Sequence, residues 1–155
     1  MKLRLIAVGT RMPAWVTAGF EDYAARLPRE LRLELVELPL SVRGKNPDVE
    51  RARQAEGEKL LERSQDTQRV VLDERGSAWS SADLSARLKR WMQDGRDVSL
   101  LVGGPDGHSA QVLGQADERW SLSKLTLPHA LVRVLVAEQL YRAWTLTVGH
   151  PYHRA

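Results

Sequence analysis

Residues 98–109 read VSLLVGGPDGHS, and this stretch decides the fold class. Val98–Val102 is a short apolar run of the kind that forms a buried strand. Gly103 and Gly104 follow it directly. Glycines at the carboxyl end of a parallel strand let a ligand approach the backbone closely, and open α/β sheets bind ligands at such strand ends. A plain tight turn would give the same pattern, so the stretch alone leaves both interpretations open.

Similar apolar runs recur along the chain and alternate with amphipathic stretches. This alternation predicts an α/β fold with a mostly parallel sheet flanked by helices. Apolar residues at helical spacing predict helices that pack on the sheet around residues 15–27 and 84–92. The runs expected to form strands are Leu3–Val8, Leu33–Leu38, Val70–Asp73, Val98–Val102 and Leu125–Leu127.

The segment Trp120–His129 reads WSLSKLTLPH and alternates leucine with small polar residues. This alternation is typical of a half-exposed strand. Hydroxyl groups and free backbone amides beside the glycine turn would also suit an adenosine, whose base needs an apolar slot and backbone hydrogen bonds. Both interpretations stay open at this point.

Residues 40–63 combine a basic loop with a charged helix. Arg43 to Pro47 reads RGKNP, which predicts a surface loop or a flap that contacts phosphate, and Asp48 is placed to cap the helix that follows. Val49, Leu60 and Leu61 form only a thin apolar stripe on Asp48–Arg63, so we expect this helix to be largely solvated.

The helix expected over Ala130–Trp144 is apolar over most of its circumference. On a helical wheel Glu138 and Arg142 share one narrow polar stripe, with Gln139 at its edge. One sheet cannot bury so wide an apolar surface, which predicts a homodimer through this helix. A central helix wholly buried inside the monomer is the alternative. Arg133 lies within the apolar arc and needs a partner there, such as an interface carboxylate, or a route to the surface.

The composition is that of one ordinary domain spanning residues 1–155, long enough to bury a core. The chain has no cysteine, which excludes thiol chemistry and suits a reducing cytoplasm. The first apolar run is too short for a membrane span or a signal peptide, so we expect a soluble, cytoplasmic protein with no membrane partner. A net charge of +3 does not by itself indicate RNA binding.

The known nucleotide and hydrolase motifs are missing, and the histidines do not form a metal motif. Gly9 follows the first strand without further glycines at dinucleotide-binding spacing, and there is no phosphate-binding Walker loop. His150 and His153 could share a metal only on a helix, which Pro151 disfavours. We therefore expect no metal site.

The tail HPYHRA gathers His150, Tyr152, His153 and Arg154 within a few residues. Chain ends are often frayed, and a polar tail by itself usually indicates disorder. These groups can nevertheless stack on a base, bind phosphate and exchange a proton. The tail is thus a second candidate for a site.

Three stretches together resemble the RlmH family of ribosomal RNA methyltransferases. They are MKLRLIAVGTRMPAWV at residues 1–16, DGRDVSLLVGGPDGHS at residues 94–109, and WSLSKLTLPHALVRVLVAEQLYRAWTLTVGHPYHR at residues 120–154. The resemblance runs over the whole chain, and the motifs are long and specific.

The resemblance implies the SPOUT fold, a single α/β domain whose C-terminal part forms a trefoil knot although knots are rare. It also implies methyl transfer from S-adenosylmethionine to N3 of a pseudouridine in a 23S rRNA stem-loop. The implied enzyme is a homodimer that acts on the assembled 70S ribosome.

The resemblance also implies site residues. Tyr152, His153 and Arg154 would reach toward the target base, with Glu138 and Arg142 at the pocket floor. The residues implied for the S-adenosylmethionine pocket are Leu72, Gly103, Gly104, Leu122, Ser123, Lys124, Leu125, Thr126 and Leu127.

Two residues depart from the family pattern. Gly149 stands where the pattern has asparagine, and His108 stands in the glycine turn where it has an apolar residue. These changes bear on the tail and on the pocket rim. Two alternative functions remain. One is a ribosome-binding factor without catalysis, and the other is a flavodoxin-like enzyme that acts on a small nucleotide.

Overall fold

The computed structural model describes residues 1–41 and 48–154 and contains one five-stranded sheet. All neighbouring strands are parallel, in the order β2-β1-β4-β3-β5. The strands are β1 (Lys2–Val8), β2 (Arg32–Leu38), β3 (Gln68–Ala78), β4 (Val98–Val102) and β5 (Glu118–Ser121). The helices are α1 (Ala14–Arg26), α2 (Val49–Arg63), α3 (Ser81–Asp94), α4 (Ala110–Gly114) and α5 (His129–Val148), with 3-10 helices η1 (Arg29–Leu31) and η2 (Pro151–Arg154). The predicted mostly parallel α/β sheet is confirmed.

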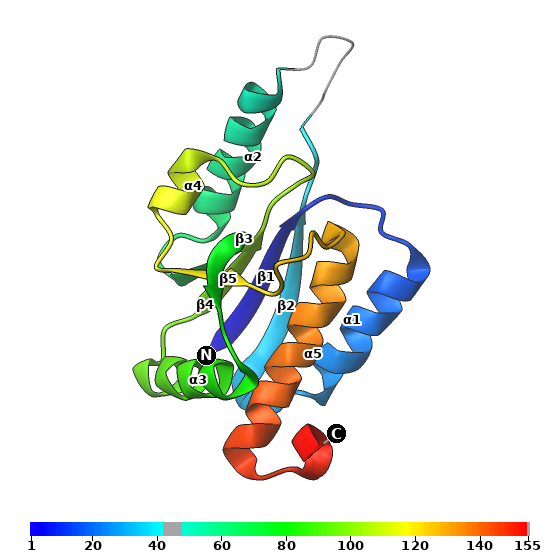
Figure 1. Cartoon of the computed structure of the whole chain (residues 1–155), viewed down its shortest axis with the longest axis vertical. Helices are drawn as coiled ribbons and strands as arrows, with labels where there is room; N and C mark the ends of the chain where they lie inside the picture. The colour runs from blue at the N-terminus through cyan, green and yellow to red at the C-terminus, as the bar shows by residue number, and fades with distance from the viewer. Residues whose placement is uncertain (42–47, 155) are drawn as a thin grey trace.

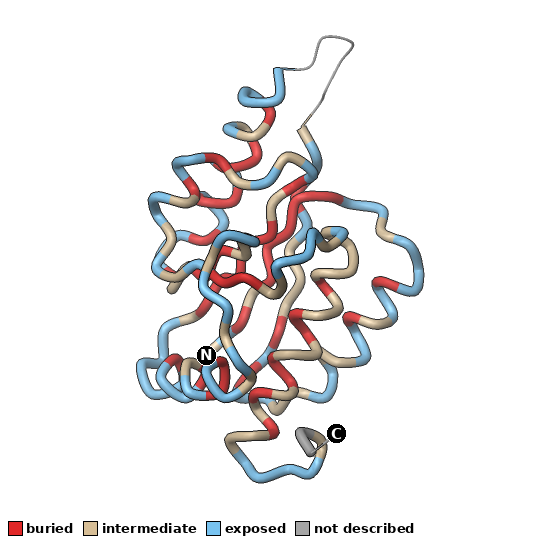
Figure 2. Tube along the Cα trace, viewed as in Figure 1, coloured by how far each residue is buried: buried red, intermediate tan, exposed pale blue. Residues whose placement is uncertain are grey.

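Helices cover both faces of the sheet, so that the molecule has three layers (Figure 1). On one face α5 packs against α1 and α3, and on the other α2 packs against α4. The side chains of β1 alternate accordingly. Leu3 and Leu5 enter the core beneath α1, α3 and α5, whereas Ile6 and Val8 enter the core beneath α2 and α4. Buried residues therefore run continuously along the central strands (Figure 2).

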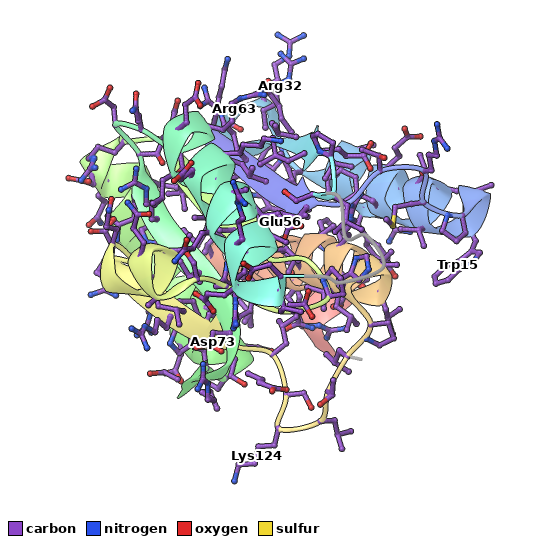
Figure 3. All side chains as sticks on the ribbon, turned by 90° about the horizontal axis from the view of Figure 1, so that it is seen from above. Trp15, Arg32, Glu56, Arg63, Asp73 and Lys124 are labelled. Atoms are coloured by element: carbon purple, nitrogen blue, oxygen red, sulfur yellow. The ribbon has the colours of Figure 1, made fainter. Side chains whose placement is uncertain are left out.

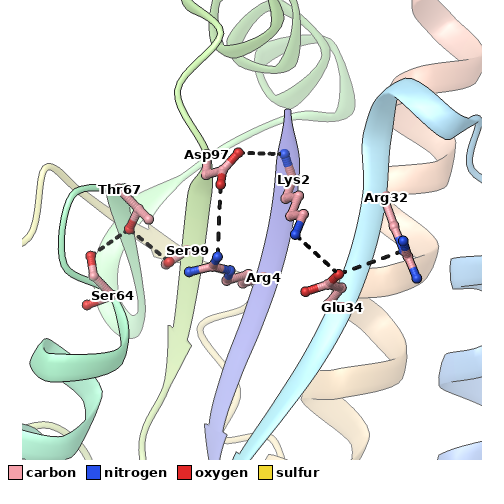
Figure 4. A network of polar contacts seen from close by, with 8 residues as sticks. All are labelled: Lys2, Arg4, Arg32, Glu34, Ser64, Thr67, Asp97 and Ser99. Carbon is pink, nitrogen blue, oxygen red and sulfur yellow. Dashed lines mark hydrogen bonds and ion pairs between the residues drawn. The ribbon is translucent and has the colours of Figure 1, made fainter.

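A polar network joins the strands at the amino edge of the sheet (Figure 4). Asp97, just before β4, accepts a hydrogen bond from the backbone nitrogen of Lys2 at 2.8 Å and lies 4.0 Å from the Arg4 guanidinium. The Thr67 hydroxyl lies 2.7 Å from the Ser64 carbonyl oxygen and 2.8 Å from the Ser99 hydroxyl. These contacts tie the strands together at the edge opposite the one where a parallel sheet binds ligands.

The expected strand at Leu125–Leu127 is wrong. The last strand is β5, which ends at Ser121, and residues 122–128 form an irregular segment between β5 and α5. β5 pairs with β3 in two pieces, because the register shifts between Leu72 and Ser77. The alternation of leucine with polar residues therefore indicates a segment with one buried side, without the backbone pairing of a strand.

Helix α2 begins with the predicted N-cap, Asp48. Asp48 accepts a hydrogen bond from the Arg51 backbone nitrogen at 3.0 Å at the start of α2. The helix is less solvated than expected, because Glu56 and Gly57 are buried together with Leu60 and Leu61. The predicted basic loop falls on residues 42–47, which lie outside the described residues.

Helix α5 is flanked by two other helices in addition to the sheet. Every residue from His129 to Thr147 is at least partly buried within the single chain. Besides the sheet, α1 and α3 supply much of the cover of this helix. The homodimer therefore stays a prediction, as does the trefoil knot.

Arg133 has its partners inside the same chain. Its side chain is 1% exposed, its Nη1 donates to Glu37 Oε2 at 2.6 Å, and its Nη2 donates to the Gly9 carbonyl oxygen at 2.8 Å. Glu37 lies on β2 and Gly9 follows β1. A buried charge thus fastens the first turns of α5 to the carboxyl edge of the sheet.

Candidate functional site

A cleft of about 510 Å³ opens at the carboxyl edge of the sheet, between the ends of β3 and β4 and the start of α5. This volume lies in the range of small-molecule pockets. Its floor and walls come from β3, the turn after β4, α4, the segment after β5 and α5. The lining residues are Arg53, Leu72, Asp73, Glu74, Arg75, Val102, Gly103, Gly104, Pro105, Asp106, Gly107, His108, Leu113, Trp120, Leu122, Ser123, Leu125, Thr126, Leu127, His129 and Val132.

Every residue predicted for the cofactor pocket lines this cleft except Lys124. The structure thus brings together Leu72, both glycines and the segment after β5, although they lie far apart in sequence. Lys124 stands at the tip of that segment, with its side chain pointing away from the body of the molecule (Figure 3).

The segment after β5 is held in shape by its own hydroxyl groups. Ser121 Oγ donates to the Ser123 carbonyl oxygen at 3.0 Å, and Ser123 Oγ accepts from the Leu125 backbone nitrogen at 2.9 Å. Thr126 Oγ1 donates to Glu74 Oε2 at 3.3 Å across the cleft mouth. Serine and threonine therefore act here as turn residues that fold the cleft wall.

The glycines of the turn are needed for the packing of the protein itself. A Cβ on Gly103 would lie 3.0 Å from the backbone of Gly107, and one on Gly104 would lie 3.0 Å from Glu56 Oε1 and 3.2 Å from Val8. Gly107 has a φ of +76°, which favours glycine. Both Gly103 and Gly104 line the cleft, and protein atoms already occupy the side on which a Cβ would stand.

His108 links the two walls of the cleft. Its Nε2 lies 3.1 Å from the Leu72 carbonyl oxygen, which can only accept, so Nε2 carries a hydrogen. Its buried Nδ1 has no hydrogen-bond partner among the described residues. Burial lowers the pKa of His108, against the opposing effect of nearby carbonyls and Asp73. The departure from the family pattern therefore places a neutral imidazole in the wall.

Unpartnered buried polar atoms gather around the cleft. Among the described residues, such atoms include Arg53 Nε, Asp73 Oδ2, His108 Nδ1 and His129 Nδ1, and all four residues line the cleft. Buried polar groups in native proteins nearly always have partners. The set contains both donors and acceptors, which fits a polar ligand that would complete them.

A second polar cluster lies on the other half of α5. Tyr152 Oη donates to Glu138 Oε1 at 3.1 Å, and Arg142 Nε donates to the same oxygen at 2.9 Å. The Arg142 guanidinium also lies 5.1 Å from the centre of the Tyr152 ring, and the Tyr141 ring packs edge-on against it at 4.6 Å. Three of the residues predicted to be catalytic are thus assembled into one cluster.

The environment of Tyr152 suits a hydrogen-bond donor. Burial, the hydrogen bond to Tyr23 and the Glu138 carboxylate together raise the pKa of Tyr152 to about 12. Its phenol therefore keeps its proton at neutral pH. The side chains of the other two predicted tail residues, His153 and Arg154, lie outside the described part of the structure.

Gly149 sets the direction of the tail. It caps α5 with a φ of +70°, and its backbone nitrogen donates to the Thr145 carbonyl oxygen. Asparagine is the other residue that adopts this left-handed conformation readily. The turn at Gly149 folds η2 back onto α5.

The tail cluster does not line the cleft within one chain. Glu138 stands nine residues after His129 on α5, which corresponds to about 13 Å along the helix axis. Within a single chain, Glu138 and Arg142 therefore do not form the floor of the cofactor pocket, contrary to the prediction.

No helix among the described residues is long and apolar enough to cross a membrane. Within residues 1–41 and 48–154, no three metal-ligating side chains gather into a site.

A doubly covered parallel sheet with a polar cleft at its carboxyl edge defines the class of α/β proteins that bind a small ligand at strand ends. A family profile described as "Predicted SPOUT methyltransferase" matches residues 1–153. The chain belongs to this SPOUT methyltransferase family.

Curated relatives match the chain over nearly its full length. It is 58% identical to the ribosomal RNA large subunit methyltransferase H of Chromohalobacter salexigens, with 99% of this chain and 100% of that protein covered. It is 56% identical to the protein of the same name from Pseudomonas putida, with the same coverage.

Solved structures share the fold at much lower identity. The tRNA (m1G37) methyltransferase of Aquifex aeolicus has a TM-score of 0.52 and 13% identity, covering 92% of this chain and 70% of that one. TrmJ of Z. mobilis has a TM-score of 0.51 and 18% identity with the same coverage.

Several residues of the cleft were missed in the sequence. Asp73 directly follows Leu72 and ends the predicted strand, so its position at a strand end was a usable signal. Arg53 and His129 come from helices, and only the packing of those helices brings them to the cleft.

Proposed function

We propose that this chain transfers a methyl group from S-adenosylmethionine to ribosomal RNA of the large subunit. The observation that carries the proposal is the full-length identity of 58% to a protein named for that activity. The cleft supports it, because its volume, its apolar side chains and its unpartnered polar atoms suit an adenosine with a polar tail.

The specific acceptor is N3 of a pseudouridine in 23S rRNA, within the assembled 70S ribosome in the cytoplasm. The support for it is the resemblance of the motifs at residues 94–109 and 120–154 to the RlmH family. A domain with a net charge of only +3 would bind free RNA weakly. The shape of the ribosome around the target then supplies specificity.

The complete site is formed by two chains. The cleft lies at the start of α5 and the tail cluster lies beyond Glu138, so one chain does not join them. A homodimer in which α5 helices cross in opposite directions would bring the tail of one chain to the cleft of its partner. The half-buried outer side of α5, which carries Leu131 and Leu135, supports such a contact.

Within this site each residue has a distinct role. The bound sulfonium supplies an activated methyl group, and the protein aligns the attacking nitrogen with it and excludes water. The N3 proton of a uracil ring is weakly acidic, so His153 accepts it while Arg154 stabilises the anion that remains. Tyr152 keeps its proton and uses it in the hydrogen bond to Glu138, so this bond and the Arg142 guanidinium hold its ring in place beside the reacting groups.

Methyl transfer from labelled S-adenosylmethionine to ribosomes that lack this modification tests the proposal. We expect label on one pseudouridine of the large subunit from 70S ribosomes, and much less from naked transcript. Equal labelling of both substrates would contradict recognition of the assembled ribosome. Failure of the chain to bind the methyl donor would contradict the enzyme and favour a binding factor.

A mixing experiment tests the two-chain site. One variant carries His153→Ala with Arg154→Ala, and the other carries Gly104→Val, so that each lacks one half. If the halves come from different chains, refolding an equal mixture restores roughly a quarter of wild-type sites. No recovery, despite dimers in both variants, would place both halves in one chain.

A further inference from the structure

Asp73 carries the strongest unexplained feature of the cleft. It follows Leu72 directly, at the point where the pairing of β3 with β5 is interrupted between Leu72 and Ser77. The interruption moves the chain out of the regular ladder. Asp73 lines the cleft next in sequence to Leu72, whose carbonyl oxygen contacts His108.

One oxygen of the Asp73 carboxylate is used and the other is not. Oδ1 accepts from the Arg75 backbone nitrogen at 3.3 Å and lies 3.8 Å from Arg75 Nε. Oδ2 is buried and has no hydrogen-bond partner among the described residues. The Asp73 side chain as a whole is 11% exposed, so solvent has little access to it. Leaving a buried carboxylate oxygen without a donor is unfavourable.

The neighbouring carboxylate on the cleft, that of Glu74, differs from Asp73 in exposure and in its hydrogen bonding. Glu74 accepts the hydroxyl of Thr126 at 3.3 Å and is exposed. Its hydrogen bond joins two parts of the cleft wall. Asp73 is therefore the acidic residue of β3 whose free acceptor atom is buried at the cleft.

The charges around Asp73 favour a neutral donor over a cationic one. The Arg75 guanidinium lies 3.8 Å from Oδ1, and Arg53 also lines the cleft. An ammonium group brought to Oδ2 would meet both positive charges, whereas a hydroxyl group would not. The sugar hydroxyl groups of an adenosine are neutral donors that prefer a carboxylate acceptor.

We propose that Asp73 binds a ribose hydroxyl group of the adenosine-containing methyl donor through Oδ2. This inference rests on the proposed function and adds a ligand-binding residue to it. Asp73 thereby fixes the sugar against the Leu72 and His108 wall, and its contribution is to affinity for every ligand that contains the adenosine.

Calorimetric binding of two ligands to the full-length protein tests the assignment. S-adenosylhomocysteine contains both the adenosine and the amino-acid part, and 5′-methylthioadenosine contains the adenosine alone. We expect Asp73→Ala to weaken both ligands equally, by roughly tenfold to a hundredfold. Asp73→Asn keeps an acceptor oxygen without the charge, so we expect a smaller loss of about threefold to tenfold.

Asp94→Asn is the matched control, because it makes the same change at an exposed residue at the end of α3 that does not line the cleft. We expect both ligands to bind this variant within about twofold of the wild type. Thermal unfolding of each variant without ligand shows whether it folds, and Asp73→Asn preserves side-chain size if Asp73→Ala does not fold.

The outcomes separate this proposal from the proposed function. Unchanged affinity in both Asp73 variants would overturn the ribose contact while leaving the methyltransferase intact. If the Asp73 variants lose affinity for S-adenosylhomocysteine but keep the wild-type affinity for methylthioadenosine, the ribose contact is overturned in favour of a contact to the ammonium group. Failure of the wild type to bind either ligand would overturn the proposed function and this contact with it.

Discussion

The two ends of α5 differ in how their polar groups are satisfied. At the first turns, the cleft holds buried atoms of Asp73, His108 and His129 that have no partner among the described residues. In the tail cluster, Glu138, Arg142 and Tyr152 satisfy one another through direct hydrogen bonds. Among the described residues, the cleft is therefore the part that a bound ligand could complete, whereas the tail cluster is already assembled.

This difference separates binding from reaction. A ligand that completes the cleft should stabilise the folded protein, and this stabilisation grows with the logarithm of the ratio of ligand concentration to dissociation constant. The tail cluster should gain nothing from that ligand, because its groups are preorganised without it. Changes at one end should then alter affinity, and changes at the other should alter turnover.

The largest effect is expected from Arg142→Ala. This change removes a charge that holds both Glu138 and the Tyr152 ring, so we expect methyl transfer to fall by roughly 100-fold to 1,000-fold. Affinity for S-adenosylhomocysteine should stay within about twofold, since Arg142 does not line the cleft. Single-turnover labelling of ribosomes and calorimetry measure the two quantities. A parallel loss of affinity would mean that the two ends of α5 are not independent.

Next in size is the effect of Arg133→Met on stability. Removing this buried charge leaves Glu37 and the Gly9 carbonyl oxygen without their donor, and we expect the free energy of unfolding to fall by about 3 kcal/mol. Urea unfolding measures it. Arg26→Met is the control, because its ion pair with Asp22 lies at the surface and should leave stability unchanged. Equal effects would show that the Arg133 pair does not anchor α5.

A smaller loss of stability is expected from Gly104→Ala. The added methyl group would lie 3.0 Å from Glu56 Oε1 and 3.2 Å from Val8, so these side chains must give way, at a cost of about 1 to 3 kcal/mol. Affinity for S-adenosylhomocysteine should fall as well. Gly114→Ala is the control, since nothing lies within 4 Å of its added Cβ. Equal stability of Gly104→Ala and Gly114→Ala would mean that the turn accommodates a methyl group at position 104 without a clash.

The smallest effect is the pH dependence due to His108. Because burial lowers the pKa of His108 below its usual value of 6.5, the unfolded chain takes up a proton first as the pH falls. Folding therefore loses at most about 1.4 kcal/mol per pH unit below about pH 6.5. Urea unfolding of wild type and His108→Leu at about pH 7.5 and about pH 5.5 measures the difference. An identical pH dependence would mean that His108 takes up its proton equally readily when folded.

The sequence predicts the sheet well, because period and composition are local properties. Leu3 and Ile6 reveal their opposite faces through simple alternation. It fails at Leu125–Leu127, because a wall with one buried side has the same alternation as an edge strand. It also treats Asp48–Arg63 as more solvated than it is, since a buried Glu56 cannot be distinguished from a surface charge by pattern alone.

For the site, the residues that come from strand ends were predictable and those from packing were not. Gly103 follows from the rule that ligands bind at the carboxyl ends of parallel strands, whereas Leu72 was implied by the family resemblance. Arg53 and His129 depend on how α2 and α5 lie over that edge. The partners of Arg133 depend on the same packing, which is why Glu37 and Gly9 could not be named from the sequence.

The strand order β2-β1-β4-β3-β5 has a consequence for how the chain is made on a ribosome. β1 and β3 are not neighbours, because β4 lies between them and pairs with both. Until Val98–Val102 has left the exit tunnel, β1 can pair only with β2, and β3 has no strand beside it. Nascent chains shorter than this keep an open apolar edge, which chaperones recognise and which other unfinished chains can pair with. The core can therefore close only late in synthesis, when β4 enters as the central strand.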